Sequence, residues 1–399
     1  MMLGALRIRD FRLLWSARLV SLLGSWLLVI AIPAHVFTLT GSVAATGLTV
    51  AAEFLPVALL APVAGMIADR WDRRWLMVGA DAFRAVAVAV MFAARTPDTV
   101  WIVYFALVAE SAGSVVFRPA AQAQTPLVVG TGPQLSSANS LNAMVDGTVR
   151  LVGGPVGALL LALAGFDVLI VVDCASYLIS AAAIMMTRSR TQAMQKRGVD
   201  FTGGFRVLAE KPFVRALLPV TTAFLMADAA LSALLIPYGL ANLGGTQQLG
   251  YLMSALGVGF LAGAPVARIL VDRVQAKYVL TGSLVVTALG FALLFHSTLI
   301  PALGAGVVIG VAGSTALITP TVVLQRILPN DVLGRVVAVF IAGEALASLV
   351  GALLGPVSAD TFGMSTVTTV ASVVTLVAGL ACLLLPHIRS DALVSAGNG

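Results

Sequence analysis

The sequence predicts an all-α polytopic membrane protein in which twelve transmembrane helices form two pseudo-repeats of six. Three observations favour this class. Hydrophobic residues make up 59% of the 399 residues and charged residues only 11%, against roughly 25% charged residues in soluble domains. The hydrophobic residues are gathered in stretches long enough to cross a bilayer, which takes about 20 residues. Finally, two segments far apart in the chain resemble each other, as expected if the two halves of the chain share one fold.

Twelve hydrophobic stretches follow one another, six on each side of a polar segment. In the first half they cover 13–37, 46–67, 75–94, 100–117, 141–164 and 168–186. In the second half they cover 216–238, 249–270, 279–295, 300–323, 332–354 and 367–385. We therefore predict three parts, namely an N-terminal six-helix bundle at 1–186, a cytoplasmic linker at 187–213 and a C-terminal six-helix bundle at 214–399.

Basic residues predict the orientation in the membrane. The two termini, the linker and every second loop hold nearly all the Lys and Arg residues between spans, whereas the opposite loops hold only Arg95. Cytoplasmic loops carry such an excess of positive charge. We therefore expect both termini and the linker in the cytoplasm. The net charge of +6 is explained by the same asymmetry beside anionic lipid, so nucleic acid is not an expected partner.

A short internal repeat supports the division into halves. Residues 61–74 and 264–277 both begin with Ala-Pro-Val-Ala and share an Asp-Arg pair at the same spacing. A weaker echo relates the Gly-Pro-Val segments at 154–156 and 355–357. Parallel six-helix repeats are an architecture of secondary transporters, in which one half moves against the other. The repeat therefore predicts a transporter, which we expect to work as a monomer.

The loop after the second span carries a specific motif. The segment GMIADRWDRR at 65–74 matches every fixed position of GxxxDRxxRR, so the sequence resembles the major facilitator superfamily. The segments LRIRDFRLLWSARLVSLLGSW, FRPAAQAQTP, VDCASYLISA and LQRILPNDVLGRV resemble its bacterial branch of enterobactin and macrolide exporters.

This resemblance implies more than the composition does. It implies the twelve-helix facilitator fold in the bacterial cytoplasmic (inner) membrane. It also implies alternating-access export of a small amphipathic molecule, such as a drug, a macrolide or a siderophore-like compound, in exchange for protons. Uptake of a nutrient or metabolite by the same fold is the alternative.

We interpret part of the loop motif as a conformational latch formed by Gly65, Asp69, Arg70, Arg73 and Arg74. A glycine allows another helix to approach closely. Asp69 places a negative charge at the cytoplasmic edge, where the N-terminus of a helix carries a positive partial charge. The eleventh predicted span begins at this edge, so we expect the motif to hold one transport state through that helix.

Several acidic residues fall inside predicted spans, where ionisable side chains are costly and usually functional. Two of them have a basic residue about one helical turn away. Asp81 precedes Arg84 by three positions, and Asp146 precedes Arg150 by four. Side chains at these spacings lie on the same face of a helix. We therefore predict two buried charge pairs.

Three other acidic residues are candidates for proton coupling. Glu53, Glu110 and Asp228 have no basic residue within one turn of their own helix. The charge of such a carboxylate is costly inside a bilayer, so the group is suited to binding and releasing a proton. Asp173 lies near the start of the sixth span, and we expect it close to the outer surface.

Two spans depart from patterns common in proton-driven exporters of the superfamily. In the fifth span, Gly154, Pro155 and Gly157 predict a bend, but the segment GPVGAL lacks the final glycine pair of GPxxGG. In the fourth span, the segment ESAG beginning at Glu110 stands where many exporters carry the arginine of RxxQG. The coupling residue is therefore left open among the three candidates.

The sequence contains no common catalytic signature. It has no HExxH and no GxxxxGK[ST] segment, and its histidines, His35, His296 and His387, lie at separate span ends. Cys174 and Cys382 lie in hydrophobic stretches, away from positions that favour a disulfide. We expect no enzyme, no cofactor and no metal, and as partners a small-molecule substrate, protons and the lipid bilayer. An ATP-driven pump and a polytopic membrane enzyme are less favoured alternatives.

Overall fold

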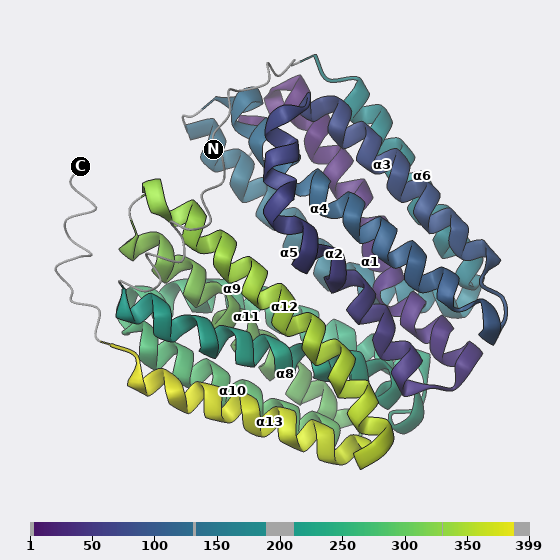
Figure 1. Ribbon diagram of the computed structural model, residues 1–399, viewed down its shortest axis with the longest axis vertical. Coiled ribbons are helices and arrows are strands. Elements are labelled where there is room, and N and C mark those ends of the chain that lie inside the picture. The colour runs from purple at the N-terminus through teal and green to yellow at the C-terminus, as the bar shows by residue number, and fades with distance from the viewer. Residues whose placement is uncertain (1–3, 131–132, 189–210, 329, 387–399) are drawn as a thin grey trace. The chain divides into compact units, whose positions relative to one another are not determined.

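In the computed structural model, the chain divides into two units, residues 1–198 and 199–399. The structure describes residues 4–130, 133–188, 211–328 and 330–386. Within these ranges each unit contains six long helices and no strand (Figure 1). Most of the predicted linker at 187–213 lies outside the described residues, and the boundary between the units falls within it.

The first unit is a bundle in which α1 and α4 make the most extensive contacts with the other helices. Its helices are α1 (Arg9–Thr40), α2 (Val43–Arg70), α3 (Arg73–Ala89), α4 (Trp101–Val129), α5 (Pro133–Ala164) and α6 (Phe166–Met185). Helix α1 packs on α2, α5 and α6, while α3 packs on α4 and α6, and α2 on α4. Single turns of 3-10 helix stand at Gly4–Arg7, Val90–Ala93 and Pro97–Thr99.

The second unit repeats this packing plan. Its helices are α8 (Pro212–Asn242), α9 (Thr246–Arg273), α10 (Ala276–Phe295), α11 (Leu299–Ile327), α12 (Asn330–Phe362) and α13 (Met364–Ala381). Helix α8 packs on α12 and α13 as α1 packs on α5 and α6, and α9 packs on α11 as α2 packs on α4. Helix α10 contacts α11 and α13, as α3 contacts α4 and α6. The predicted fold class, two six-helix repeats, is confirmed.

The helices have the length and composition of membrane spans. Among the described residues, 11 helices are long and apolar enough to cross a membrane. The remaining predicted span, in α5, is also helical, over 32 residues. Large apolar side chains stay exposed, for example Leu178 and Ile179 of α6 at 56% and 55%. Outward apolar surface on this scale fits contact with lipid, so the protein is a multi-pass membrane protein.

Several helices, α4 and α5 among them, continue well beyond the spans predicted from hydropathy. Helix α4 was expected to end at residue 117 but runs to Val129, with Pro119 and Pro126 inside it. Helix α5 begins at Pro133, whereas its span was expected from residue 141. Hydropathy detects only the apolar part of a helix, and the polar residues around Gln122 and Asn139 hide these helical ends.

Helix starts and turns in both units have local causes. The side chains of Ser42 and Asp72 accept hydrogen bonds of 2.9–3.3 Å from backbone N–H groups in the first turns of α2 and α3. Gly165 separates α5 from α6 with φ 81°, and Gly363 separates α12 from α13 with φ 84°. Because this region of φ is strained for other residues, both sharp turns require glycine.

Helix α5 continues through Gly154, Pro155 and Gly157, the positions predicted to form a bend. In the structure Gly157 lies against the backbone of α1, where an added Cβ would stand 2.2 Å from the carbonyl oxygen of Leu27. The absence of a side chain therefore allows close packing of α5 on α1, as small residues do in membrane bundles.

We expect Gly157→Val to force α1 and α5 apart and to destabilise the first unit by about 1–3 kcal/mol, the usual cost of overpacking. Thermal unfolding of the purified protein in detergent would measure the loss. Gly79→Val is the matched control, because Gly79 is exposed and a Cβ there would meet no atom within 4 Å. Equal unfolding temperatures for the two variants would contradict the close contact.

Candidate functional site

The loop between α2 and α3 is tied to other helices of the first unit by two arginines. Arg73 is 6% exposed, and its guanidinium donates to the carbonyl oxygen of Ala123 in α4 at 3.2 Å. The guanidinium of Arg74 donates to the carbonyl oxygen of Met185 at the end of α6. The loop motif therefore fixes the start of α3 against α4 and α6.

The other latch residues, Gly65, Asp69 and Arg70, lie on α2, but the structure does not describe the placement of their side chains. Their role therefore stays a prediction. The repeat offers a guide, because Asp272 of α9 stands 203 positions after Asp69. Asp272 forms an ion pair with Arg326 of α11, whose guanidinium also donates to the carbonyl oxygen at 271. At the position of the second repeat that corresponds to Asp69, an aspartate therefore forms an ion pair with an arginine of a neighbouring helix.

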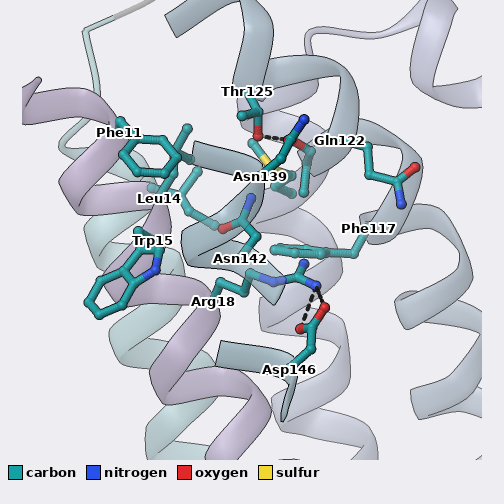
Figure 2. Close-up of a pocket in the computed structure, with 13 residues that line it drawn as sticks. Phe11, Leu14, Trp15, Arg18, Phe117, Gln122, Thr125, Asn139, Asn142 and Asp146 are labelled. Atoms are coloured by element: carbon teal, nitrogen blue, oxygen red, sulfur yellow. Dashed lines mark hydrogen bonds and ion pairs between the residues drawn. The ribbon is translucent and has the colours of Figure 1, made fainter. Parts of the chain in front are cut away.

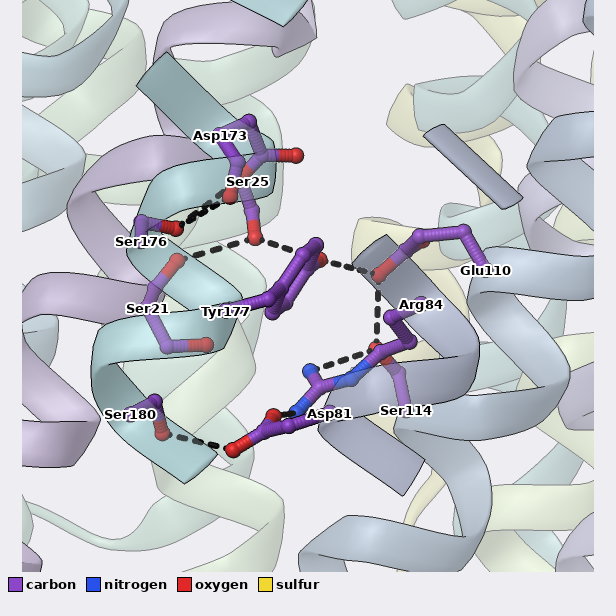
Figure 3. Close-up of polar contacts among 10 residues, drawn as sticks. All are labelled: Ser21, Ser25, Asp81, Arg84, Glu110, Ser114, Asp173, Ser176, Tyr177 and Ser180. Carbon is purple, nitrogen blue, oxygen red and sulfur yellow. Dashed lines mark hydrogen bonds and ion pairs between the residues drawn. The ribbon is translucent and has the colours of Figure 1, made fainter. Parts of the chain in front are cut away.

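A buried polar network lies inside the first unit (Figure 3). It starts from the Asp81–Arg84 ion pair, which the sequence predicted and which is formed on α3. Asp81 is 0% exposed and Arg84 5%. The hydroxyl of Ser180 in α6 donates to Asp81 at 2.6 Å. The Arg84 guanidinium lies 4.5 Å from the ring centre of Phe117 and 4.4 Å from that of Tyr177. Both charges are thus fully enclosed.

Glu110 of α4 is connected to this ion pair by hydrogen bonds. Arg84 donates to Ser114 at 3.2 Å, and Ser114 donates to Glu110 at 2.8 Å. Tyr177 of α6 donates to the same carboxylate oxygen at 2.7 Å. The Tyr177 hydroxyl also lies 2.9 Å from that of Ser25 in α1. One chain of hydrogen bonds therefore joins α1, α3, α4 and α6 at Glu110, as Figure 3 shows.

The predicted position of Asp173 is wrong. Its side chain is 1% exposed, and its carboxylate accepts a hydrogen bond of 3.2 Å from Ser176. Asp173 follows Asp167 by six residues, which is about 9 Å along a helix and enough to leave the surface. A Cβ at Gly24 of α1 would lie 2.4 Å from the Asp173 carboxylate. Gly24 therefore makes room for a carboxylate between α1 and α6.

The three proton-coupling candidates occupy different places. Glu53 of α2 lies close to α4, since Ser111 donates to its backbone carbonyl at 2.6 Å. Ser111 directly follows Glu110, so Glu53 and Glu110 belong to contacting turns of α2 and α4. Asp228 lies on α8 in the second unit, is half-buried and takes part in an interaction of its own. Two candidates thus lie together in the first unit.

Asp146 of the predicted Asp146–Arg150 pair has a partner on another helix, and its pairing with Arg150 stays a prediction. Both carboxylate oxygens of Asp146 accept hydrogen bonds from Arg18 of α1, at 2.7 and 2.9 Å. The side chain of Arg150 lies outside the described part of α5. Spacing along one helix cannot reveal this partner, because packing of α1 on α5 brings Arg18 into place. The signal in the sequence is a charged residue inside the first span.

The Arg18–Asp146 pair borders a cavity of about 240 Å³ within the first unit (Figure 2). Both polar and aromatic side chains line it. The polar lining consists of Arg18, Gln122, Thr125, Asn139, Asn142 and Asp146, and the aromatic lining of Phe11, Trp15 and Phe117. The sequence analysis did not identify this cavity, because its residues come from helix ends spread over more than a hundred positions.

A second cavity, of about 390 Å³, lies in the second unit between α8, α12 and α13. Its lining contains no charged side chain, and small residues such as Ala227, Ala230 and Gly351 form much of it. Among the described residues, no group of three or more His, Cys, Asp or Glu side chains could hold a metal. Cys174 and Cys382 are both free thiols.

Two six-helix repeats, with ionisable side chains enclosed among membrane-length helices, define a secondary transporter of the major facilitator type. The chain belongs to the transmembrane secretion effector family, which it matches over residues 2–397. The predicted class, an efflux transporter of the major facilitator superfamily, is confirmed.

Relatives of known name cover nearly the whole chain. The chain is 24% identical to macrolide efflux protein A of Streptococcus pyogenes, over 95% of this chain and 96% of the relative. It is 26% identical to the multidrug efflux pump Tap of Mycolicibacterium fortuitum, over 96% and 97%. The crystal structure of the nucleoside transporter NupG is similar with a TM-score of 0.75 and 14% identity, over 94% of this chain and 98% of NupG. The last comparison shows the fold alone.

Proposed function

We propose that this chain exports small amphipathic molecules, macrolides among them, across the bacterial inner membrane in exchange for protons. The named relatives, a macrolide efflux protein and a multidrug efflux pump, support the substrate class. The position of Glu110 in a hydrogen-bonded chain across four helices supports proton coupling and is the observation that carries it. In this proposal the protein works as a monomer with both termini in the cytoplasm.

In this proposal, proton binding and helix movement are coupled because a proton changes how strongly the Glu110 side chain accepts hydrogen bonds. As a carboxylate, Glu110 accepts hydrogen bonds from Ser114 of its own helix and from Tyr177 of α6. A proton that binds to this carboxylate from the outer side removes its charge, so the oxygen becomes a weaker acceptor for the Tyr177 hydroxyl. The contact between the hydroxyls of Tyr177 and Ser25 of α1 does not involve the carboxylate and is kept. Proton binding therefore weakens the connection of α4 to α6, and release to the cytoplasm restores it.

Glu53 has a place in the same proposal as a second proton site. Its helix contacts α4 at Ser111, the residue that follows Glu110. Asp228 is the corresponding candidate in the second unit. If the substrate binds more tightly when these carboxylates are ionised, substrate binding promotes proton release and proton binding promotes substrate release. The two binding equilibria are thermodynamically linked, which is the requirement for exchange.

The direction of proton movement tests the proposal. The purified protein is reconstituted in liposomes with an acidic lumen, a trapped pH dye and labelled erythromycin outside. We expect accumulation of erythromycin together with substrate-dependent alkalinisation of the lumen, both beyond the level in protein-free liposomes, and neither in liposomes whose pH gradient nigericin has already collapsed. Accumulation that nigericin does not change would contradict proton antiport. Acidification of the lumen during substrate entry would show symport instead, as expected for an uptake carrier.

The loop between α2 and α3 remains, in our proposal, the latch that controls alternation. We expect Asp69→Lys to reduce transport to background while the protein still inserts, since a positive charge there repels a helix N-terminus and nearby arginines. Transport in liposomes and the amount of inserted protein are both measured. Asp98→Lys, which changes an exposed acid near the other end of α3, is the control and should transport normally. Normal flux through Asp69→Lys would contradict the latch.

A further inference from the structure

Residues near the ends of several helices of the first unit line the cavity of Figure 2. Trp15 and Arg18 belong to the first turns of α1, and Asn142 to the first turns of α5, while Gln122 lies near the end of α4. These helix ends are on the side where basic residues predict the cytoplasm. The cavity is therefore placed where an exporter would take up its cargo.

The polar lining is partly unsatisfied. One terminal nitrogen of the Arg18 guanidinium donates to both carboxylate oxygens of Asp146. The buried Nε of Arg18 has no hydrogen-bond partner among the described residues. The Asp146 side chain is 45% exposed, so lone pairs of its carboxylate remain open. Carboxamides of Asn139 and Asn142 add groups that can both donate and accept. Since a buried donor without a partner is costly, the site favours a ligand that brings acceptors and donors.

Aromatic rings accompany these groups. Figure 2 shows Trp15 and Phe117 on either side of Arg18 and Asn142 in this view. The indole N–H of Trp15 donates to the carbonyl oxygen of Leu141 at 3.3 Å, which fixes the orientation of the ring. The cavity thus combines fixed apolar faces with amide, carboxylate and guanidinium groups.

The combination selects a ligand class. A cation or an anion would gain little, because Arg18 and Asp146 already neutralise each other. A ring with several hydroxyl groups and an apolar face matches both the polar groups and the aromatic rings. The volume of about 240 Å³ is below the roughly 300–1,000 Å³ of pockets for drug-sized molecules, so one ring fits rather than a whole macrocycle. We infer that this cavity binds the sugar ring of an amphipathic glycoside, an inference that rests on the proposed export function.

Binding without transport tests this inference. The protein is placed in phospholipid nanodiscs, which contain no sugar detergent, and titrated with labelled erythromycin and with its sugar-free aglycone. We expect the aglycone to bind at least tenfold more weakly. We also expect Asn142→Ala and, separately, Gln122→Ala to weaken erythromycin binding about tenfold while leaving aglycone binding unchanged. Gln134→Ala is the matched control, because Gln134 is exposed on α5 and is not part of the lining.

The outcomes separate the inference from the proposed function. Equal affinity for erythromycin and its aglycone, or unchanged erythromycin binding in both variants, would overturn the sugar site. Absence of binding for either compound would also overturn it. None of these results bears on proton antiport, which is decided by the direction of proton movement in liposomes. Gln122 lies exposed at the cavity rim, so its variant is expected to fold even if Asn142→Ala does not.

Discussion

Glu110→Gln is expected to abolish proton-driven accumulation of substrate and to leave substrate exchange intact. Glutamine keeps the shape of the side chain and an oxygen that accepts from Ser114 and Tyr177, but it cannot bind and release a proton. Alternation between the two states then no longer depends on the proton gradient. In liposomes we expect accumulation to fall at least tenfold, to the level without a gradient, while exchange of labelled against unlabelled erythromycin continues.

Two further variants make this result specific. Asp98→Asn removes an exposed carboxylate of the same unit and should accumulate substrate like the wild type. Tyr177→Phe removes the donor to Glu110 and should accumulate less than the wild type but keep a response to the gradient. Accumulation at the wild-type level by Glu110→Gln would remove Glu110 from the mechanism. Coupling would then be tested in Glu53→Gln and Asp228→Asn, the remaining candidates.

The fold could be predicted from sequence because the bilayer imposes a simple rule on composition. Every span needs about 20 apolar residues, so the helices were found and the repeat at 61–74 and 264–277 indicated two halves. The helix ends were not predicted, since outside the apolar region hydropathy carries no signal. Gln122 and Asn139 lie on such extensions of α4 and α5, and both line the cavity of the first unit. The cavity was therefore missed for the same reason as the helix ends.

The candidate site was predictable only where its parts are close in sequence. Asp81 and Arg84 lie three positions apart on one helix, so their spacing alone predicts the pair. Arg18 and Asp146 belong to different helices, and nothing in their sequence separation points to a contact. Tyr177 is an ordinary residue in an apolar span until packing places its hydroxyl beside Glu110. Contacts across helices required the structure.

Removal of Arg84 alone is expected to destabilise the protein strongly. Asp81 is 0% exposed, and besides Arg84 it has a hydrogen bond from Ser180. Without Arg84 its charge would remain buried and uncompensated, which typically costs about 3–5 kcal/mol. Arg84→Met also removes the guanidinium that lies over the rings of Phe117 and Tyr177. We expect a large fall in the unfolding temperature of the purified protein in detergent.

The double variant Asp81→Leu/Arg84→Met is expected to recover much of that loss, because it removes both charges and leaves apolar side chains of similar size. Arg95→Met is the matched control, since Arg95 pairs with Asp167 through side chains that are 54% and 48% exposed. An exposed pair contributes about 1 kcal/mol or less, so this variant should unfold close to the wild type. A double variant no more stable than Arg84→Met would show that Arg84 stabilises the unit through its contacts with the rings and Ser114, and that neutralising Asp81 is not its main role.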